Sequence, residues 1–378
     1  MIRTIGYDAT AAVRQAAGIG RYTRELLRSL SAGDDEFRYH AFSCSGGAIA
    51  GGLPPLNGKV RHRAVPVSDR VMNAIWHRAH LPVPAQLFTG RFDLFHSPDF
   101  TLPPVLNRPT ILTVHDLGFL RSPGTAYPTL RAYLQRTVPA SISRATRVIA
   151  VSENTRRDLM ELLNVPPERV SVIYEGVGSD FHPPYDLSLA EKTLHRYGIQ
   201  GPYILSVGTL EPRKNYQRLL EAYALLRRRG VEHRLVIAGR PGWMFQPVLQ
   251  RLDDLGLRAY TSIIEPNDEA LVDLYGMADA FVYPSLYEGF GIPPLEALAC
   301  GAPAAVAGTS SLPEVVGDAA LTFDPLDVDS MAGALEALLV DKGLAARLRA
   351  AGPQRAANFS WESAALQTTA LYRQVLDG

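Results

Sequence analysis

Short apolar runs alternate with amphipathic stretches along the whole chain, and this alternation constrains the fold more than any other feature. In the first half, the apolar runs predict strands at residues 2–7, 92–96, 110–114, 147–151 and 170–174. Helical spacing is found between them at 20–30 and 154–164, and Ser152 is placed to cap the second helix. Strands separated by helices are typical of a parallel α/β sheet.

The same alternation begins again at residue 203, which predicts a second doubly wound unit. Its strands are expected at 203–207, 234–238, 261–264, 280–283 and 302–307, with helices at 215–230, 267–278 and 294–301. A chain of 378 residues suits two domains. We expect domains at 1–180 and 181–358, joined by the Gly- and Pro-rich linker 176–186, and a final helix in 359–378 that packs back across the hinge.

Composition indicates a globular protein, with 47% hydrophobic and 20% charged residues. Cys44 and Cys300 lie far apart and lack metal-ligand spacing, so neither a disulfide framework nor a zinc site is expected. The sequence begins without an apolar leader, and no apolar run is long enough to cross a membrane. We therefore expect a cytoplasmic protein.

Charge is distributed unevenly between the two halves. Residues 1–180 hold 21 Lys and Arg against 15 Asp and Glu, whereas residues 181–378 hold 17 against 23. The segment 121–157 contains seven arginines and a single acid, Glu153. This excess predicts contact with an acidic partner, such as the inner face of a membrane or a lipid phosphate, and a solvated helix face is the alternative. No feature indicates nucleic-acid binding.

The segment GTLEPRKN, residues 208–215, follows a predicted strand and leads into a helix with Asn215 as its expected N-cap. Gly208 permits a tight turn, and Arg213 with Lys214 places two cations beside a helix N-terminus. Backbone amides, the helix dipole and two cations together predict a phosphate site. The alternative is a capped helix with ordinary surface charges.

The segment YEGFGIPPLEA, residues 287–297, holds two carboxylates, Glu288 and Glu296, on either side of a glycine turn. A helix is expected to begin near Pro293 or Pro294, which would place Glu296 in its first turn. Glu296 could then accept hydrogen bonds from a ribose, and Glu288 could hold a sugar hydroxyl. A first-turn acid that only compensates the helix dipole is the alternative for Glu296. Glycine would let three backbone amides approach the ligand, those of Phe290, Gly291 and Ile292.

At these motifs, from residue 1 to about 375, the chain resembles the retaining group 1 glycosyltransferases of the two-domain GT-B architecture. The resemblance also rests on VSENTRRDL at 151–159 and TSSLPEVVGDAAL at 309–321. It implies two Rossmann-like domains facing a central cleft, with the nucleotide-sugar donor on the second and the acceptor on the first. It further implies diphosphate contacts from Arg213 and Lys214 and ribose binding by Glu296.

In the first half, the resemblance places His115 of TVHDLGF near the transferred sugar and matches Gly18 and Gly20 to an N-terminal glycine loop. The same segment lacks the third glycine of a dinucleotide fingerprint, which argues against a dehydrogenase. His96 and Asp99 end another strand, where a place in the acceptor cleft and a core or turn role are equally open.

The chain departs from the family pattern at the base-binding strand, where it has Ile264, Glu265 and Pro266 in place of a glycine, an aromatic residue and valine. A carboxylate at Glu265 could accept from two guanine N–H groups, a pairing that uracil cannot offer. Together with the mannosyltransferase-like 285–297 segment, this favours GDP-mannose over UDP-sugars. Asp327 and Asp329 could form a metal pair, but helix capping by Asp327 is favoured.

We therefore expect a retaining mannosyltransferase of polysaccharide biosynthesis that needs no cofactor and no metal. Its acceptor would be a glycan or a lipid-linked glycan. The alternatives are a transferase using UDP-glucose or UDP-GlcNAc, a nucleotide-sugar 2-epimerase, and a non-catalytic sugar-nucleotide-binding module. The expected catalytic residues are His115, Arg213, Lys214 and Glu288.

Overall fold

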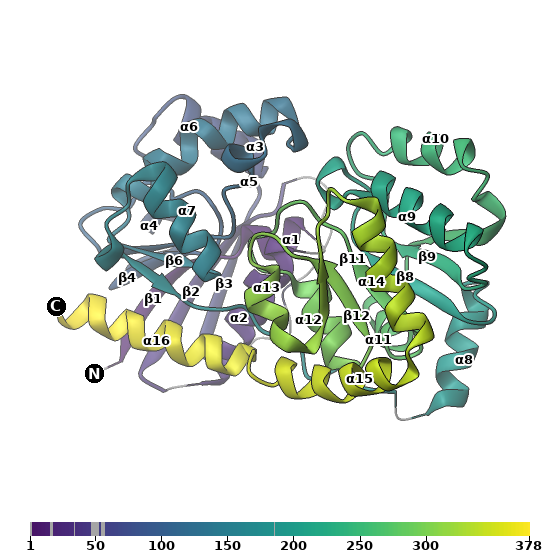
Figure 1. The fold of residues 1–378 in the computed structure, drawn as a ribbon. Coiled ribbons are helices and arrows are strands. Elements are labelled where there is room, and N and C mark those ends of the chain that lie inside the picture. Colours follow the sequence, from purple (N-terminus) through teal and green to yellow (C-terminus); the bar gives the residue numbers. More distant parts are fainter. Residues whose placement is uncertain (1, 16–17, 34, 47–52, 54–56, 185) are drawn as a thin grey trace. The chain divides into compact units, whose positions relative to one another are not determined.

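The computed structural model describes residues 2–15, 18–33, 35–46, 53, 57–184 and 186–378 (Figure 1). Ala17, part of the predicted glycine loop, lies outside these residues. The chain forms two compact units. Unit 1 comprises Met1–Arg121, Pro128–Gly176 and Ser360–Gly378, and unit 2 comprises Ser122–Tyr127 and Val177–Phe359.

Unit 1 contains a seven-stranded parallel sheet in the order β3-β2-β1-β4-β5-β6-β7. Its strands are β1 Arg3–Asp8, β2 Phe37–Cys44, β3 Val60–Val65, β4 Leu94–Ser97, β5 Thr110–Val114, β6 Arg147–Ala150 and β7 Val170–Val172. Its helices are α1 Thr10–Arg14, α2 Ile19–Ala32, α3 Asp69–Asn73, α4 Gln86–Thr89, α5 Gly118–Arg121, α6 Pro128–Arg144, α7 Glu153–Leu163 and α16 Trp361–Asp377. The strand order reverses between β1 and β4, so ligands are expected at the carboxyl ends of these two strands.

Unit 2 contains a six-stranded parallel sheet in the order β10-β9-β8-β11-β12-β13. Its strands are β8 Tyr203–Val207, β9 Arg234–Ala238, β10 Thr261–Ile264, β11 Ala280–Tyr283, β12 Ala304–Ala307 and β13 Leu321–Phe323. Its helices are α8 Leu187–Arg196, α9 Tyr216–Arg228, α10 Gln246–Asp254, α11 Asp268–Gly276, α12 Ile292–Ala299, α13 Leu312–Val316, α14 Val328–Val340 and α15 Lys342–Ala356. Here the order reverses between β8 and β11.

The two predicted parallel sheets are confirmed, and each strand expected from an apolar run is present within two residues of its predicted ends. The sequence patterns missed β2, β3 and β13. Strand β3 has little apolar content because it is an edge strand whose central residues 61–64 are exposed. Strand β13 is only three residues long, and β2 alternates aromatic with polar side chains rather than forming an apolar run.

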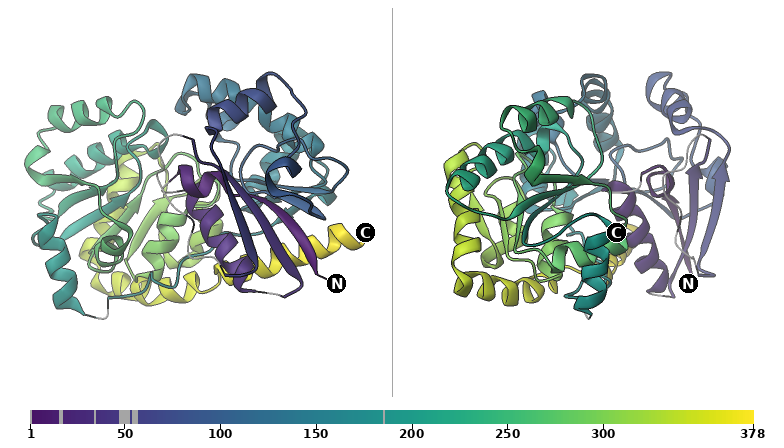
Figure 2. Two further views of the ribbon diagram at one scale, coloured as in Figure 1. Left: turned by 180° about the vertical axis from the view of Figure 1, so that it is seen from behind. Right: turned by 90° about the vertical axis from the view of Figure 1, so that its right-hand side faces the viewer.

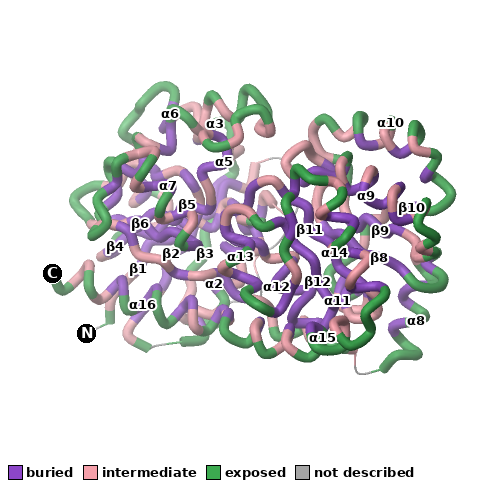
Figure 3. Tube along the Cα trace, in the orientation of Figure 1, coloured by how far each residue is buried: buried purple, intermediate pink, exposed green. Residues whose placement is uncertain are grey.

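The strands carry the buried core of each unit, and the outer turns of the helices carry most of the exposed residues (Figure 3). Helix α16 lies beside α2 within unit 1, as the left-hand view of Figure 2 also shows. A buried hydrogen bond of 2.7 Å between the His96 Nδ1 and the Tyr372 hydroxyl ties α16 to β4. Among the described residues, no helix is long and apolar enough to cross a membrane.

Candidate active site

Two loops at the carboxyl ends of β8 and β11 are joined by hydrogen bonds. The backbone amide of Leu286 donates to the Arg213 carbonyl at 2.9 Å, and the Asn215 side-chain amide donates to the Pro284 carbonyl at 3.1 Å. These strands are neighbours at the position where the strand order reverses. The structure therefore brings the predicted phosphate loop and the two-carboxylate loop together at the edge of the sheet where α/β folds bind ligands.

Glu288 is the centre of this arrangement and is only 8% exposed. Its Oε1 lies 2.6 Å from the Lys214 Nζ, and its Oε2 lies 2.7 Å from a guanidinium nitrogen of Arg213. The hydroxyls of Ser285 and Tyr283 also donate to Oε1, at 2.5 and 3.1 Å. The carboxylate is thus held by two cations and two hydroxyls. The sequence predicted the two cations as diphosphate ligands and did not predict any of the four groups as a partner of Glu288.

Electrostatics in this cluster favour a charged carboxylate. Burial, the largest influence, acts to raise the pKa of Glu288, but Arg213 and Lys214 together outweigh it and lower this pKa to about 2. Burial lowers the pKa of Lys214, while the negative charge of Glu288 acts in the opposite direction. Arg213 also contacts the carboxylate of Glu211 at 2.8 Å, so its charge is shared between two acids.

Arg213 and Lys214 lie in a 3₁₀ turn, Pro212–Lys214, immediately before α9. Asn215 occupies the N-cap position with a left-handed backbone, but its side chain makes no capping hydrogen bond. The predicted N-cap position is therefore confirmed, while the side-chain amide donates to the carbonyls of Pro284 and Pro325. Asn215 holds three loops of unit 2 together.

Gly208 lies where two chain segments pack closely. Its φ is +150°, and a Cβ added at Gly239, just after β9, would lie 1.9 Å from the Gly208 carbonyl oxygen. The Tyr216 hydroxyl, from the first residue of α9, donates to the same oxygen at 2.9 Å. Glycine at these positions lets the β8 and β9 loops approach each other beside Lys214.

Glu296 lies deeper than predicted. Helix α12 begins at Ile292, with proline in its first turn as expected, so Glu296 is its fifth residue and lies beyond the first turn. It is 2% exposed, and the Tyr275 hydroxyl donates to its Oε2 at 2.9 Å. Because Glu296 lies beyond the first turn, it is poorly placed to compensate the dipole of α12. Ribose binding by Glu296 stays a prediction.

The glycine turn before α12 is fixed by a serine pair. The Ser311 hydroxyl donates to the carbonyls of Glu288 and Phe290 at 3.0 and 2.7 Å, while the Glu288 amide donates to the Ser310 hydroxyl at 2.9 Å. Gly291 has a φ of +114° and is the N-cap of α12, which begins with Ile292. The expected donor contacts of these backbone amides stay a prediction.

Three other predicted positions lie apart from this cluster. Glu265 is exposed and directly follows β10, at the carboxyl end of that strand. Asp327 is the N-cap of α14 and accepts hydrogen bonds from the amides of Asp329 and Ser330, which confirms its capping role. In the described part of the chain, no group of three or more His, Cys, Asp or Glu side chains is arranged to hold a metal ion.

His115, in unit 1, directly follows β5 and is 7% exposed. Its Nδ1 lies 3.1 Å from a Glu175 carboxylate oxygen, and its Nε2 lies 2.9 Å from the Pro98 carbonyl oxygen. Burial, the largest influence, would lower the pKa of His115, but Glu175, the Pro98 carbonyl and Asp99 together raise it above its ordinary value. The Glu175 partner was not predicted from the sequence.

The glycine loop precedes α2 in unit 1. Gly18 has a φ of +57° and is the N-cap of α2. A Cβ added at Gly20 would lie 2.0 Å from the Gln15 carbonyl oxygen, so only glycine fits here without a shift of the backbone. Contact of Gly18 and Gly20 with the donor stays a prediction.

The structure separates the two polar residues of the FHSPDF segment. His96 is fully buried and bonded to the Tyr372 and Thr113 hydroxyls, and burial lowers its pKa to about 3. The sequence left open whether His96 lies in the acceptor cleft or in the core, and the structure places it in the core. Asp99, by contrast, lines a pocket at the carboxyl edge of the sheet.

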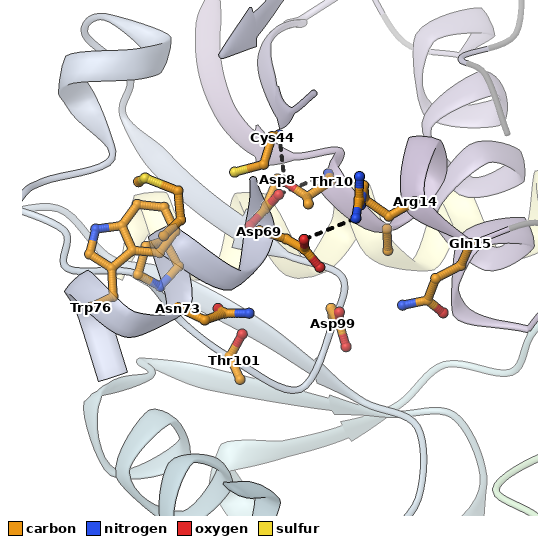
Figure 4. Close-up of a pocket in the computed structure, with 13 residues that line it drawn as sticks. Asp8, Thr10, Arg14, Gln15, Cys44, Asp69, Asn73, Trp76, Asp99 and Thr101 are labelled. Atoms are coloured by element: carbon orange, nitrogen blue, oxygen red, sulfur yellow. Dashed lines mark hydrogen bonds and ion pairs between the residues drawn. The ribbon is translucent and has the colours of Figure 1, made fainter. Parts of the chain in front are cut away.

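This pocket lies entirely within unit 1 and is shown in Figure 4. Carboxylates, amides, hydroxyls and one indole line it, from Asp8, Thr10, Gln15, Asp69, Asn73, Trp76, Asp99 and Thr101. Among the described residues that line it, the only cation is Arg14, which lies 3.2 Å from the Asp69 carboxylate. Burial, the largest influence, raises the pKa of Asp8 to about 6 and also raises that of Asp99. Asp8 ends β1, a position where a polar residue could have been noticed in the sequence.

Several arginines of the segment 121–157 are used inside unit 1. Arg121 pairs with Asp158 at 2.6 Å and with Glu161, and Arg144 donates to the carbonyls of Leu102 and Pro103. Arg136 remains exposed, with a hydrogen bond of 2.9 Å to His80. The charge that the segment can present to a partner is smaller than its composition suggests.

Two parallel-sheet Rossmann-like units, with cations and a carboxylate at the carboxyl ends of neighbouring strands, are typical of the GT-B glycosyltransferases. Sequence comparison agrees: residues 195–355 match the family of glycosyl transferases group 1, and residues 16–181 match glycosyltransferase family 4. The chain is 33% identical over 376 residues to the O-antigen chain mannosyltransferase B of Escherichia coli, covering 94% of this chain and 96% of that protein. The chain belongs to the group 1 glycosyltransferases and is a hexosyltransferase.

Two further comparisons concern a second relative and a solved structure. The chain is 31% identical over 281 residues to a D-inositol 3-phosphate glycosyltransferase of Mycolicibacterium paratuberculosis (strain ATCC BAA-968 / K-10), covering 71% of this chain and 62% of that protein. The structure of sucrose-phosphate synthase from Thermosynechococcus elongatus superimposes with a TM-score of 0.79 at 20% identity, covering 99% of both chains. The second comparison supports the fold alone.

Proposed function

We propose that this enzyme transfers mannose from GDP-mannose, with retention of anomeric configuration, to the hydroxyl of a glycan acceptor. The supporting observation is the buried cluster of Arg213, Lys214 and Glu288 where the strand order of unit 2 reverses. The similarity to an O-antigen chain mannosyltransferase favours mannose as the transferred sugar.

The two cations suit the negative charge that develops on a departing diphosphate. Cleavage of the bond between the anomeric carbon and the phosphate oxygen leaves that charge on the nucleotide, so groups that bind it more tightly as it grows lower the barrier. Retention requires the acceptor to approach the face that the diphosphate leaves. We propose that the leaving phosphate oxygen accepts the acceptor's proton on this face, with Glu288 holding a hydroxyl of the sugar.

The remaining proposed donor contacts follow the family pattern except at Glu265, where the chain departs from it. His115 is proposed to contact the C6 hydroxyl of the transferred sugar, Glu296 to accept from the ribose, and Glu265 to accept from guanine. Gly18, Gly20, Gly208 and the amides of 290–292 would let the backbone approach the donor. Thermal unfolding with a panel of nucleotide sugars tests the donor, because a ligand at about 100 times its Kd stabilises by about 2.7 kcal/mol. Stabilisation by UDP-glucose and not by GDP-mannose would contradict the choice.

We propose that transfer requires no metal ion and no other cofactor, since Arg213 and Lys214 supply the positive charge at the diphosphate. Activity should therefore survive EDTA. Loss of activity in EDTA, with recovery on addition of Mg²⁺ or Mn²⁺, would show that this proposal is wrong.

The pocket of unit 1 suggests a neutral, hydroxyl-rich acceptor. Carboxylates and amides accept and donate hydrogen bonds to sugar hydroxyls, and Trp76 adds an apolar surface. A phosphate group would meet Asp8, Asp69 and Asp99, whereas the lining cation Arg14 is already paired. A mannose-terminated oligosaccharide should therefore accept mannose, and D-inositol 3-phosphate should not.

We also propose that the enzyme is cytoplasmic and touches the inner membrane face through α6, where Arg136 and Leu130 are exposed. An arginine near an anionic leaflet contributes about 1 kcal/mol. Co-sedimentation with anionic vesicles at low and high salt tests this contact, and Arg136→Glu should weaken it. Absence of binding at low salt would contradict it.

Product analysis separates transfer from the other activities considered. Incubation with GDP-mannose and a mannose-terminated oligosaccharide should yield GDP and an elongated glycan. An epimerised nucleotide sugar or free nucleotide formed equally well without acceptor would indicate an epimerase, and no turnover with any donor that binds would indicate a binding protein.

A further inference from the structure

The buried contact between His115 and Glu175 carries an inference beyond the family pattern. Glu175 is 5% exposed, and its carboxylate oxygen lies 3.1 Å from the His115 Nδ1. The other ring nitrogen, Nε2, lies 2.9 Å from the Pro98 carbonyl oxygen. A carbonyl oxygen can only accept, so Nε2 must carry a proton.

The charge state of the ring follows from these two partners. If the imidazole were neutral, its one ring proton would be on Nε2. The lone pair of Nδ1 would then face the negatively charged carboxylate of Glu175. A second proton on Nδ1 removes this repulsion and makes a charge-assisted hydrogen bond to Glu175. The geometry therefore favours an imidazolium paired with a carboxylate.

The surroundings of the ring hold it in this orientation. The ring edges of Tyr22, from α2, and Phe100, from the loop after β4, pack against it at centroid distances of 4.7 and 5.7 Å. Two further titratable groups lie near the ring of His115. Asp99, in the loop after β4, adds negative charge, and His96 is a second histidine close to His115. Glu175 is the acid that contacts the ring. The Thr155 hydroxyl fixes the backbone by donating to the His115 carbonyl at 3.0 Å.

Glu175 itself is placed by the path of the chain. It precedes Gly176, the last residue of this part of unit 1, where an added Cβ would lie 2.3 Å from the Trp361 amide nitrogen. Two segments of the unit therefore meet at the residue that follows Glu175, and glycine at 176 permits this approach. The position of Glu175 is set by packing of backbone against backbone rather than by a mobile loop.

We propose that Glu175 is a positioning residue that holds His115 as a cation, with its Nε2–H available to a sugar oxygen in exchange for the Pro98 carbonyl. The proposal rests on the function proposed above, in which His115 contacts the transferred sugar. A carboxylate that orients a functional histidine and stabilises its charged form is a recurrent arrangement in enzymes.

The test separates the charge of Glu175 from its hydrogen bond. Glu175→Gln keeps an acceptor for Nδ1–H and removes the charge, whereas Glu175→Ala removes both. Glu168→Gln is the matched control, because Glu168 is exposed and lies seven residues earlier in the approach to β7. Circular dichroism and thermal unfolding show whether each variant is folded.

The first measurement is the titration of His115 by NMR, assigned by comparison with His115→Asn. Loss of a contacting negative charge should move its titration midpoint down by about 1 to 3 pH units in Glu175→Gln, with no change in Glu168→Gln. An unchanged midpoint in folded Glu175→Gln would overturn the proposal.

The second measurement is the pH profile of kcat. A cationic His115 predicts a loss of kcat on the alkaline side, and Glu175→Gln should move this limb to lower pH while leaving the Kd for GDP unchanged. Glu175→Ala should lower kcat by about 10- to 100-fold. A lower kcat without movement of the limb would indicate a purely structural role and overturn the proposal.

If the wild type transfers no sugar from any donor while His115 titrates as expected, the proposed function fails and the histidine–carboxylate pair stands.

Discussion

The Nζ of Lys214 and the Oε1 of Glu288 lie 2.6 Å apart, and both residues are buried. Arg213 contacts the other oxygen of the same carboxylate. Both cations proposed for the diphosphate therefore contact the Glu288 carboxylate, and Arg213 contacts Glu211 as well. A bound diphosphate would have to compete with this carboxylate, which makes Glu288 a regulator of the cations as well as a candidate ligand of the sugar.

Replacement of Lys214 by alanine should lower kcat by about 10²-fold, equivalent to about 2.7 kcal/mol of transition-state stabilisation. The reason is loss of a cation that would bind the leaving diphosphate more strongly as its charge grows. Arg213→Ala should have a similar effect. Turnover is measured at saturating donor and normalised to folded enzyme, because the substitution also removes a partner of buried Glu288.

The control is Lys192→Ala, at an exposed position of α8. It removes the same charge from unit 2 and should leave kcat within about twofold, since exposed charges contribute little. Equal turnover in Lys214→Ala and Lys192→Ala would remove Lys214 from the proposed mechanism.

The stability of unit 2 should depend on pH through Glu288. Its pKa is lowered from 4.5 to about 2 in the folded chain, so its contribution is present above pH 4.5 and is lost as the pH falls toward 2. Glu288→Gln should reduce the free energy of unfolding by about 3 kcal/mol at pH 7, and this difference should narrow by about half at pH 3. Urea unfolding at both pH values measures it, and a difference that does not change with pH would contradict it.

The positions of the site loops could be predicted from the sequence because both follow apolar strands. Residues 208–215 and 287–297 contain the charges, and the rule that ligands lie at strand carboxyl ends brings them together. The partners of those charges could not be predicted. Tyr283 is the buried last residue of a strand, and its contact with Glu288 depends on how the loop folds back. Glu175 lies 60 residues from His115, and no local pattern connects them.

The depth of Glu296 shows a similar limit. Proline in the first turn correctly marked the start of α12, but the helix begins at Ile292, one or two residues before the predicted start at Pro293 or Pro294. This difference carries Glu296 past the first turn, and its contact with Tyr275 comes from α11. Sequence spacing therefore identified the carboxylate but not its environment, which is set by packing between helices.

His96 should make unit 1 less stable in mild acid. Burial lowers its pKa from 6.5 to about 3, so between these values the unfolded chain binds a proton that the folded chain does not. The free energy of unfolding should therefore fall as the pH falls from 6.5 toward 3, by at most about 1.4 kcal/mol per pH unit. His96→Asn removes this titration and should flatten the dependence, as measured by urea unfolding between pH 7 and 4. An equal slope in both proteins would contradict the assignment.

Gly20→Ala should destabilise unit 1 and lower transferase activity, because the new Cβ would lie 2.0 Å from the Gln15 carbonyl oxygen. The start of α2 must then shift, together with the loop that carries Gly18. Overpacking of this kind costs about 1–3 kcal/mol.

Gly333→Ala is the matched control, since Gly333 lies within helix α14 and its added Cβ meets nothing within 4 Å. That substitution should stabilise the chain by about 0.5–1 kcal/mol through helix propensity. Thermal unfolding and kcat/KM for GDP-mannose compare the two variants, and wild-type values for Gly20→Ala would show that the close approach of Gln15 is not required.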